Sequence, residues 1–213
     1  VKMDPLLESR PEYYTKCVPD NIYGKSIPQS PYLWPLLSSE PENYRYISPG
    51  EFLQKAERGT LTLDEIFMFN MVHDINTTND FGRTALMFSC EIGDMETATM
   101  LLNRGAEIDQ VDKNDQTALM MACESGHYDI VDMLLEREPE LDQKDIEGKT
   151  ALIIAFEEGH MDIVELLIYF GADVEMNLDY VRGHYEEQDD DEEQIDDQRI
   201  QELITLLQNN FYI

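Results

Sequence analysis

The sequence predicts an all-α solenoid in which pairs of antiparallel helices stack side by side. A short phrase, Thr-Ala-Leu followed by Met or Ile, returns every 33 residues, at 84–87, 117–120 and 150–153. A glycine follows nine residues after each threonine, at Gly93, Gly126 and Gly159. Eight residues later comes an aliphatic pair, at Leu101-Leu102, Leu134-Leu135 and Leu167-Ile168. Because several positions agree in register, they indicate one helix-turn-helix unit repeated three times.

Residues 1–48 differ from the rest and predict an extended arm. They hold seven of the nine prolines, six tyrosines and the only tryptophan, Trp34. Proline fixes φ and removes a backbone donor, which favours extended and turn conformations. The aromatic content is too high for a purely solvating tail. The arm is expected either to cover the first repeat of its own solenoid or to dock on another protein.

Residues 49–78 predict a degenerate N-terminal capping repeat. Pro49 suits the first position of a helix, and Phe52, Leu53 and Ala56 fall on one helical face that ends at Gly59. A second helical pattern follows, with apolar residues at Leu63, Ile66, Phe67 and Met71. Atypical terminal units are expected in a repeat array.

Three regular repeats follow, at 79–111, 112–144 and 145–177. In each, the threonine can cap free backbone N–H groups, the leucine two residues on points inward, and the glycine permits a tight reversal. The second helices present the stacking faces. Their predicted members are Thr97, Ala98, Met100 and Leu101, then Ile130, Val131, Met133 and Leu134, then Ile163, Val164, Leu166 and Leu167. The first of these faces is the least apolar and should pack least tightly.

This pattern over Asn79 to Asn177 resembles ankyrin repeats, with departures. Ankyrin units usually have Pro after the Thr and His after the Leu, whereas this chain has alanine at the first place and Met87, Met120 or Ile153 at the second. Apolar contact must therefore carry more of the packing between repeats. Asp115 and Glu138 stand where the other repeats have turn glycines, which predicts strained or remodelled loops on both sides of the second repeat.

Residues 178–213 predict an acidic insertion and a C-terminal capping helix. The stretch 186–197 has nine carboxylates and no basic residue. Helical periodicity returns in Ile200, Leu203, Ile204, Leu206 and Leu207. The segment resembles the second helix of a repeat whose first helix has been replaced by the acidic insertion.

Charge and composition limit the function classes. The 213 residues carry a formal net charge of -30, which disfavours nucleic acid and anionic membrane surfaces as ligands. No apolar run reaches the roughly 20 residues of a membrane span, and no secretory pattern opens the chain. A cytoplasmic, reducing location is expected, with Cys17, Cys90 and Cys123 as thiols rather than a disulfide or metal framework. The oligomeric state is not indicated.

No catalytic, cofactor-binding or metal site is expected. His127 and His160 follow the mid-repeat glycines at equivalent positions, which favours a structural role, and His73 and His184 are isolated. Residues 112–116 superficially resemble the start of a calcium loop, but they lack its sixth-position glycine, and the repeat phase explains them. Phosphate-cradling loops and nucleophile elbows are absent.

The resemblance implies that a partner meets the projecting turns and first helices, which form a concave face in ankyrin-like solenoids. From the first repeat the face would include Asp80, Phe81, Arg83, Glu91 and Ile92. From the second it would include Lys113, Asn114, Gln116, Glu124 and Ser125. From the third it would include Ile146, Glu147, Lys149, Glu157 and Glu158. Exposed apolar anchors among carboxylates suit an interface, although Phe81 and Ile146 could instead cover neighbouring turns.

The leading hypothesis is a non-catalytic module that binds a protein partner, with a basic surface, and sequesters or inhibits it through the concave face and the acidic insertion. An immunity protein, a chaperone for a basic client and an effector delivered into host cells all fit this description. The alternative is a structural or regulatory subunit whose Pro/Tyr-rich arm is the main docking element.

Overall fold

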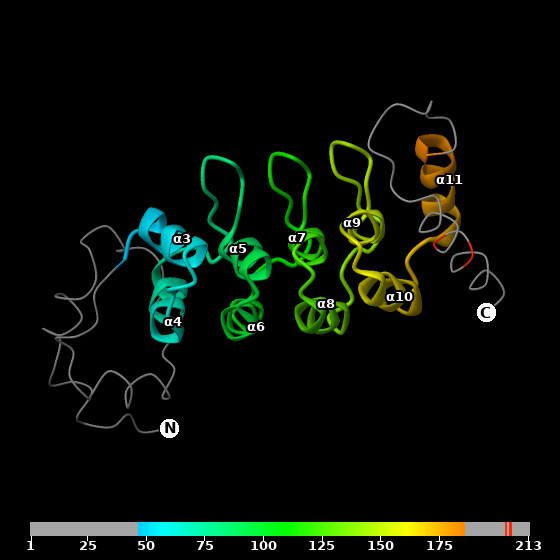
Figure 1. The fold of residues 1–213 in the computed structure, drawn as a ribbon. Helices are drawn as coiled ribbons and strands as arrows, with labels where there is room; N and C mark the ends of the chain where they lie inside the picture. The colour runs from blue at the N-terminus through cyan, green and yellow to red at the C-terminus, as the bar shows by residue number, and fades with distance from the viewer. Residues whose placement is uncertain (1–46, 186–202, 204, 206–213) are drawn as a thin grey trace, which may run out of the picture.

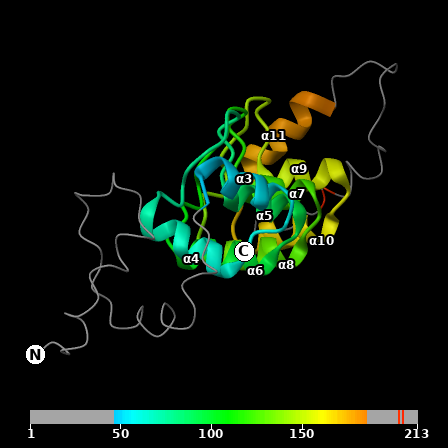
Figure 2. The same cartoon turned by 90° about the vertical axis from the view of Figure 1, so that its left-hand side faces the viewer.

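The computed structural model describes residues 47–185 together with 203 and 205. Within that part the chain forms helices in the following order: α3 (Pro49–Glu57), α4 (Leu63–Val72), α5 (Ala85–Ile92), α6 (Met95–Asn103), α7 (Ala118–Glu124), α8 (Tyr128–Leu135), α9 (Ala151–Glu158), α10 (Met161–Tyr169) and α11 (Val174–Tyr185). Figure 1 shows α3, α5, α7 and α9 in one layer and α4, α6, α8 and α10 in a second. Figure 2, which looks along the stack, shows the helices of each layer one behind the other, with the α3, α5, α7 and α9 layer above the α4, α6, α8 and α10 layer. The predicted all-α repeat fold is confirmed.

The recurring threonines begin the first helices as predicted. Each hydroxyl oxygen accepts a hydrogen bond from the backbone N–H three residues on: Thr84 from Met87 (3.2 Å), Thr117 from Met120 (3.3 Å) and Thr150 from Ile153 (3.4 Å). Gly93 and Gly159 end α5 and α9 in the left-handed conformation, with φ of 83° and 85°. This cap and this glycine explain why the helices remain short.

The first helices form the centre of the core. Residues 85–90, 118–123 and 151–156 are all buried. Each of these helices is packed on several sides. Helix α7, for example, lies between α5 and α9 and also packs against α8. Met87, Met120 and Ile153 are among these buried residues, so apolar packing occupies the positions where ankyrin units usually have histidine.

The second helices bury one face, and the predicted faces need one correction. Met100, Met133 and Leu166 are only half-buried, whereas Leu135 and Ile168 are buried. In α8 the buried positions are 130, 131, 134 and 135, so the face runs along i, i+1, i+4 and i+5. The i+3 position lies at the edge of that face.

The N-terminal unit also has the predicted helices. Ser48 caps α3, and Pro49 takes its first turn. The rings of Phe52 and Phe69 stack with their centroids 3.8 Å apart and join α3 to α4. Residues 1–46 of the predicted arm lie outside the described residues.

Helix α11 was not predicted. The sequence indicated that the first helix after the third repeat is replaced by the acidic insertion, but a helix begins at Val174. The Asp173 carboxylate accepts a hydrogen bond from the backbone N–H of Met176 (2.9 Å), and Asn177 and Val181 are buried. This helix occupies the chain segment that forms a projecting turn in the preceding repeats (Figure 1). Leu203 is helical and buried, while the acidic stretch 186–197 lies outside the described residues.

Both loops flanking the second repeat have the strained backbone that the sequence predicts. Asp115 and Glu138 have φ of 58° and 55°, a region that side chains with a Cβ rarely adopt. Gly148 and Gly171 adopt the same region at the equivalent places in the third repeat. The second repeat therefore carries backbone strain at two positions.

Substituting Glu138→Gly is expected to stabilise the protein. Removing the strain of a left-handed non-glycine residue stabilises the folded state by about 1–2 kcal/mol. The greater conformational entropy of glycine in the unfolded chain offsets about 0.5–1 kcal/mol of this gain. We expect the midpoint of urea unfolding, followed by circular dichroism, to be higher for Glu138→Gly than for the original chain. The matched control is Gly171→Ala, where a new Cβ meets nothing within 4 Å, so only the backbone conformation opposes it. If G171A leaves stability unchanged, the strain argument fails.

Candidate functional site

The candidate site is built on three projecting turns, which we call fingers: residues 79–83, 112–116 and 145–149. Each finger is closed by the side chain of its first residue. Its Oδ1 accepts hydrogen bonds from two backbone N–H groups: Asn79 from Phe81 (2.8 Å) and Arg83 (3.0 Å), Asp112 from Asn114 (2.7 Å) and Gln116 (3.1 Å), and Asp145 from Glu147 (2.9 Å) and Lys149 (2.8 Å). Asp112 therefore organises the turn of the second finger.

Backbone hydrogen bonds join the fingers to one another. The N–H of Lys113 donates to the carbonyl of Phe81, and the N–H of Ile146 donates to the carbonyl of Asn114, both at 3.0 Å. The predicted fingertip residues are thereby held side by side. Phe81 is 69% exposed and Ile146 is 63% exposed, so most of each side chain is open to solvent. Asp80 and Lys113 are also exposed.

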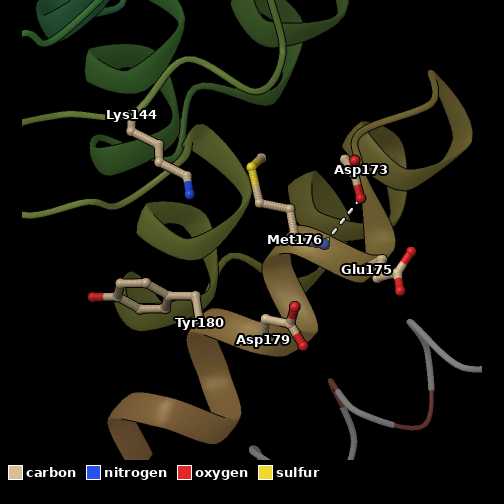
Figure 3. Close-up of a pocket in the computed structure, with 6 residues that line it drawn as sticks. All are labelled: Lys144, Asp173, Glu175, Met176, Asp179 and Tyr180. Carbon is tan, nitrogen blue, oxygen red and sulfur yellow. Dashed lines mark hydrogen bonds between the residues drawn. The ribbon is translucent and has the colours of Figure 1, made fainter.

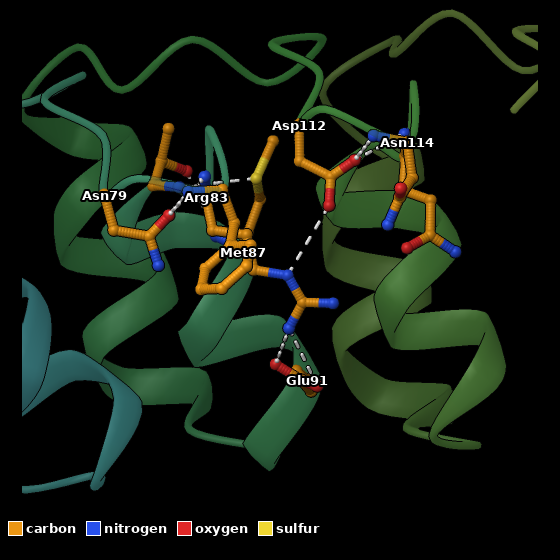
Figure 4. A network of polar contacts seen from close by, with 9 residues as sticks. Asn79, Arg83, Met87, Glu91, Asp112 and Asn114 are labelled. Carbon is orange, nitrogen blue, oxygen red and sulfur yellow. Dashed lines mark hydrogen bonds and ion pairs between the residues drawn. The ribbon is translucent and has the colours of Figure 1, made fainter. Parts of the chain in front are cut away.

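A second group of predicted residues lies where the finger bases meet the C-terminal ends of the first helices. Arg83 Nη1 is 2.9 Å from Glu91 Oε2, and Arg83 Nε is 3.5 Å from Asp112 Oδ2 (Figure 4). In the third repeat Lys149 Nζ lies 2.8 Å from Glu157 and 2.9 Å from Glu147. Burial alone would lower the pKa of Lys149, but hydrogen bonds to Glu157 and Glu147 outweigh it and raise the pKa. Both cations are therefore held by carboxylates of the same chain.

The second repeat differs because Gln116 stands at the place of Arg83 and Lys149. Glu124 is the equivalent of Glu91 and Glu157, and it is exposed together with Ser125. Burial and the nearby carboxylates of Glu158 and Glu91 raise the pKa of Glu124, and this outweighs the opposing effect of Arg83 and Lys149. In the middle of the site Glu124 therefore lies near other carboxylates, with no basic residue at the base of its own finger.

Ile92 and the two repeat histidines contribute to stacking. A Cβ on Gly59 would lie 2.9 Å from Ile92 Cδ1, so Ile92, although 41% exposed, packs over the preceding unit. A Cβ on Gly93 would lie 2.8 Å from the His127 ring, and one on Gly126 would clash with the His160 ring. His127 Nε2 also lies 3.1 Å from the carbonyl oxygen of Glu91. The predicted structural role of these histidines is confirmed.

Cys90 and Cys123 are free thiols in the core, as expected of core cysteines. Burial raises the pKa of the Cys90 thiol to about 12 and raises that of Cys123 further. A thiol with so high a pKa is a poor nucleophile at neutral pH.

A cavity of about 400 Å³ lies beside α11 and borders the third finger, because a Cβ on Gly148 would lie 4.0 Å from the Tyr180 ring. Figure 3 shows its lining residues: Lys144, Asp173, Glu175, Met176, Asp179 and Tyr180. The Asp173 carboxylate is already used to cap α11. Burial is the main cause that raises the pKa of Tyr180. Among residues 47–185, 203 and 205, no group of three or more His, Cys, Asp or Glu side chains is arranged to hold a metal ion.

Sequence reasoning missed two sets of polar residues that hold the repeats together. The first is the turn-closing set, Asn79, Asp112 and Asp145. The second joins adjacent repeats, with Oδ1 of Asn76, Asp109 and Asp142 accepting from the backbone N–H of Glu107, Glu140 and Asp173 at 2.9, 2.9 and 2.8 Å. The signal was available, because both sets recur every 33 residues as Asn or Asp.

Comparisons with known proteins agree with this geometry. Residues 53–145 match a family described as ankyrin repeats in three copies, and residues 147–177 match the single ankyrin repeat. A search of curated proteins found no match. In the part of the chain that the structure describes, no helix has the length and apolar character needed to cross a bilayer. Ankyrin-repeat proteins are typically non-catalytic modules for protein–protein interaction. Because the matched residues span the observed stack from α3 to α10, the chain belongs to the ankyrin-repeat family.

Proposed function

We propose that this protein binds a protein partner with a basic surface and sequesters or inhibits it. The surface used is the docking face, which we define as the fingertips and the finger bases with the C-terminal ends of α5, α7 and α9. One observation carries the proposal. The face combines exposed apolar fingertips with an excess of carboxylates, and its Arg83 and Lys149 are already held by Glu91, Glu147 and Glu157.

The charge of the whole chain supports a basic partner. A net charge of -30 creates a field that speeds encounter with cationic proteins and opposes anionic ones, most strongly at low salt. Phe81 and Ile146 supply the apolar contact that charge alone lacks. We infer that the acidic stretch 186–197 adds to the same field.

The proposal is tested by affinity capture with the full-length chain at low and high ionic strength, followed by mass spectrometry. The double variant Phe81→Ala/Ile146→Ala is expected to reduce the affinity for the captured partner about tenfold or more, equivalent to about 1.4 kcal/mol of binding free energy. Raising the salt concentration is expected to reduce recovery. The matched control is Tyr169→Ala, which removes an 83% exposed aromatic from α10 in the other helical layer and should leave binding unchanged.

The opposite pattern would point to the arm. If binding survives the fingertip variant and is lost in Tyr32→Ala/Trp34→Ala, the Pro/Tyr-rich arm is the docking element. Recovery that is insensitive to salt would contradict the basic partner.

A further inference from the structure

The three repeats provide an internal comparison at one pair of positions on the docking face. In the first repeat Arg83 at the finger base pairs with Glu91 at 2.9 Å. In the third, Lys149 pairs with Glu157 at 2.8 Å. The second repeat keeps the carboxylate, Glu124, but has Gln116 at the base. The flanking repeats thus show a side-chain cation seated at a place that is neutral in the middle repeat.

Arg83 also shows how far such a cation reaches. Its guanidinium contacts Glu91 in its own repeat and lies 3.5 Å from Asp112, the residue that closes the next finger. The equivalent carboxylates in the middle repeat are Glu124 and Asp145. Among the described residues neither Glu124 nor Asp145 has an ion-pair partner within 4 Å.

The charges around Glu124 indicate what would bind there. Glu91 and Glu158 face it as anions, and the nearest cations, Arg83 and Lys149, are engaged with other carboxylates. An incoming cation would reduce this repulsion, whereas an anion would increase it. Binding would also occur at the middle of the face, where partly desolvated contacts contribute most.

We propose that the middle repeat receives one arginine side chain of the basic partner, seated beside Gln116 and bridging Glu124 and Asp145. The inference rests on the proposed function and specifies what the docking face recognises. Arginine is favoured over lysine because the Arg83 guanidinium spans from Glu91 to the first residue of the next finger, whereas the two carboxylates that Lys149 contacts both belong to its own repeat.

The probe is N-acetyl-arginine amide, titrated into the isotope-labelled full-length chain and followed by two-dimensional NMR at about 100 mM salt. The largest amide shifts are expected at Gln116, Glu124 and Asp145. Gln116→Arg and Glu124→Gln should each reduce these shifts at least about fivefold. Glu165→Gln, which neutralises an exposed carboxylate on α10, should not. N-acetyl-lysine amide should bind at least about threefold more weakly.

Two results would overturn the inference. Shifts that spread over residues with carboxylates throughout the chain and persist in Q116R would show that the middle repeat has no specific arginine site. Equal binding of the lysine probe would contradict the preference for arginine. Gln116→Lys is a second variant that places a cation of the chain itself in the proposed site. Circular dichroism melts of Q116R and Q116K verify that both fold.

The captured partner separates this inference from the proposed function. E124Q and Q116R should weaken its binding about fivefold or more. If the fingertip variant abolishes binding but Q116R and E124Q do not weaken it, the docking face is correct and the arginine seat is wrong. If the fingertip variant leaves binding intact, the proposed function itself fails.

Discussion

Replacing Phe156 with alanine is expected to lower the free energy of unfolding by about 3–5 kcal/mol. The ring is fully buried in α9, which packs against both α7 and α10. Removing it eliminates transfer free energy and leaves a cavity that the surrounding helices can fill only in part. Because neighbouring repeats stabilise each other, a loss in α9 weakens the interface with the second repeat as well. Urea unfolding followed by circular dichroism measures the effect.

Phe81 provides the matched control for this prediction. The substitution is chemically identical, but the ring is 69% exposed at a fingertip, so Phe81→Ala should change stability by no more than about 0.5 kcal/mol. A large loss for F81A, or a small one for F156A, would contradict the described packing. The same F81A protein then serves the binding experiments, because its fold is expected to be intact.

Replacing Asp112 with alanine is expected to destabilise the protein by about 2–4 kcal/mol, more than a typical polar substitution. The carboxylate has only 1% of its side-chain surface exposed, and it accepts hydrogen bonds from the N–H groups of Asn114 and Gln116. It also faces Arg83 at 3.5 Å. Alanine would leave two backbone donors and part of a guanidinium charge without their acceptor. Urea unfolding again gives the value.

Asp112→Asn separates the two contributions. The amide oxygen can keep both turn hydrogen bonds, as Asn79 does in the first finger, while the carboxylate oxygen opposite Arg83 is replaced by a neutral NH2 group. Asp112→Asn should therefore lower the free energy of unfolding clearly less than Asp112→Ala does. Equal losses would show that the ion pair, rather than the turn, is the main role of Asp112.

The repeat core could be predicted from the sequence because its constraints are local and periodic. A threonine at the start of a helix, an inward leucine and a left-handed glycine each have one physical role, and each recurs 33 residues later. Burial of Leu86, Leu119 and Leu152 follows from that periodicity. The positive φ of Asp115 and Glu138 was predictable for the same reason, since the other repeats require glycine there.

The ends of the stack were harder to predict. Helix α11 does not repeat the Thr-Ala-Leu phrase and lies in a different register from the preceding first helices. Its position depends on packing by residues such as Asn177 and Val181, which no periodic pattern identifies. The half-buried Met133 was misplaced because the edge of a helical face depends on what lies opposite.

For the candidate site, the sequence offered a set of residues as a prediction but did not indicate that they lie in two groups. Fingertip exposure of Phe81 and Ile146 required the backbone ladder between fingers, and the ion pairs of Arg83 and Lys149 required the approach of a turn to a helix end. The 33-residue period already places Gln116 between Arg83 and Lys149, and the fold adds that these two cations are paired with carboxylates of their own repeats.

Hydrogen exchange of the full-length chain, measured with and without the captured partner, tests the docking face most directly. Binding there should slow exchange in the fingers at 79–83, 112–116 and 145–149 and at the C-terminal ends of α5, α7 and α9, leaving α6, α8 and α10 unchanged. Protection confined to α6, α8 and α10, with the fingers exchanging as in the free protein, would contradict it.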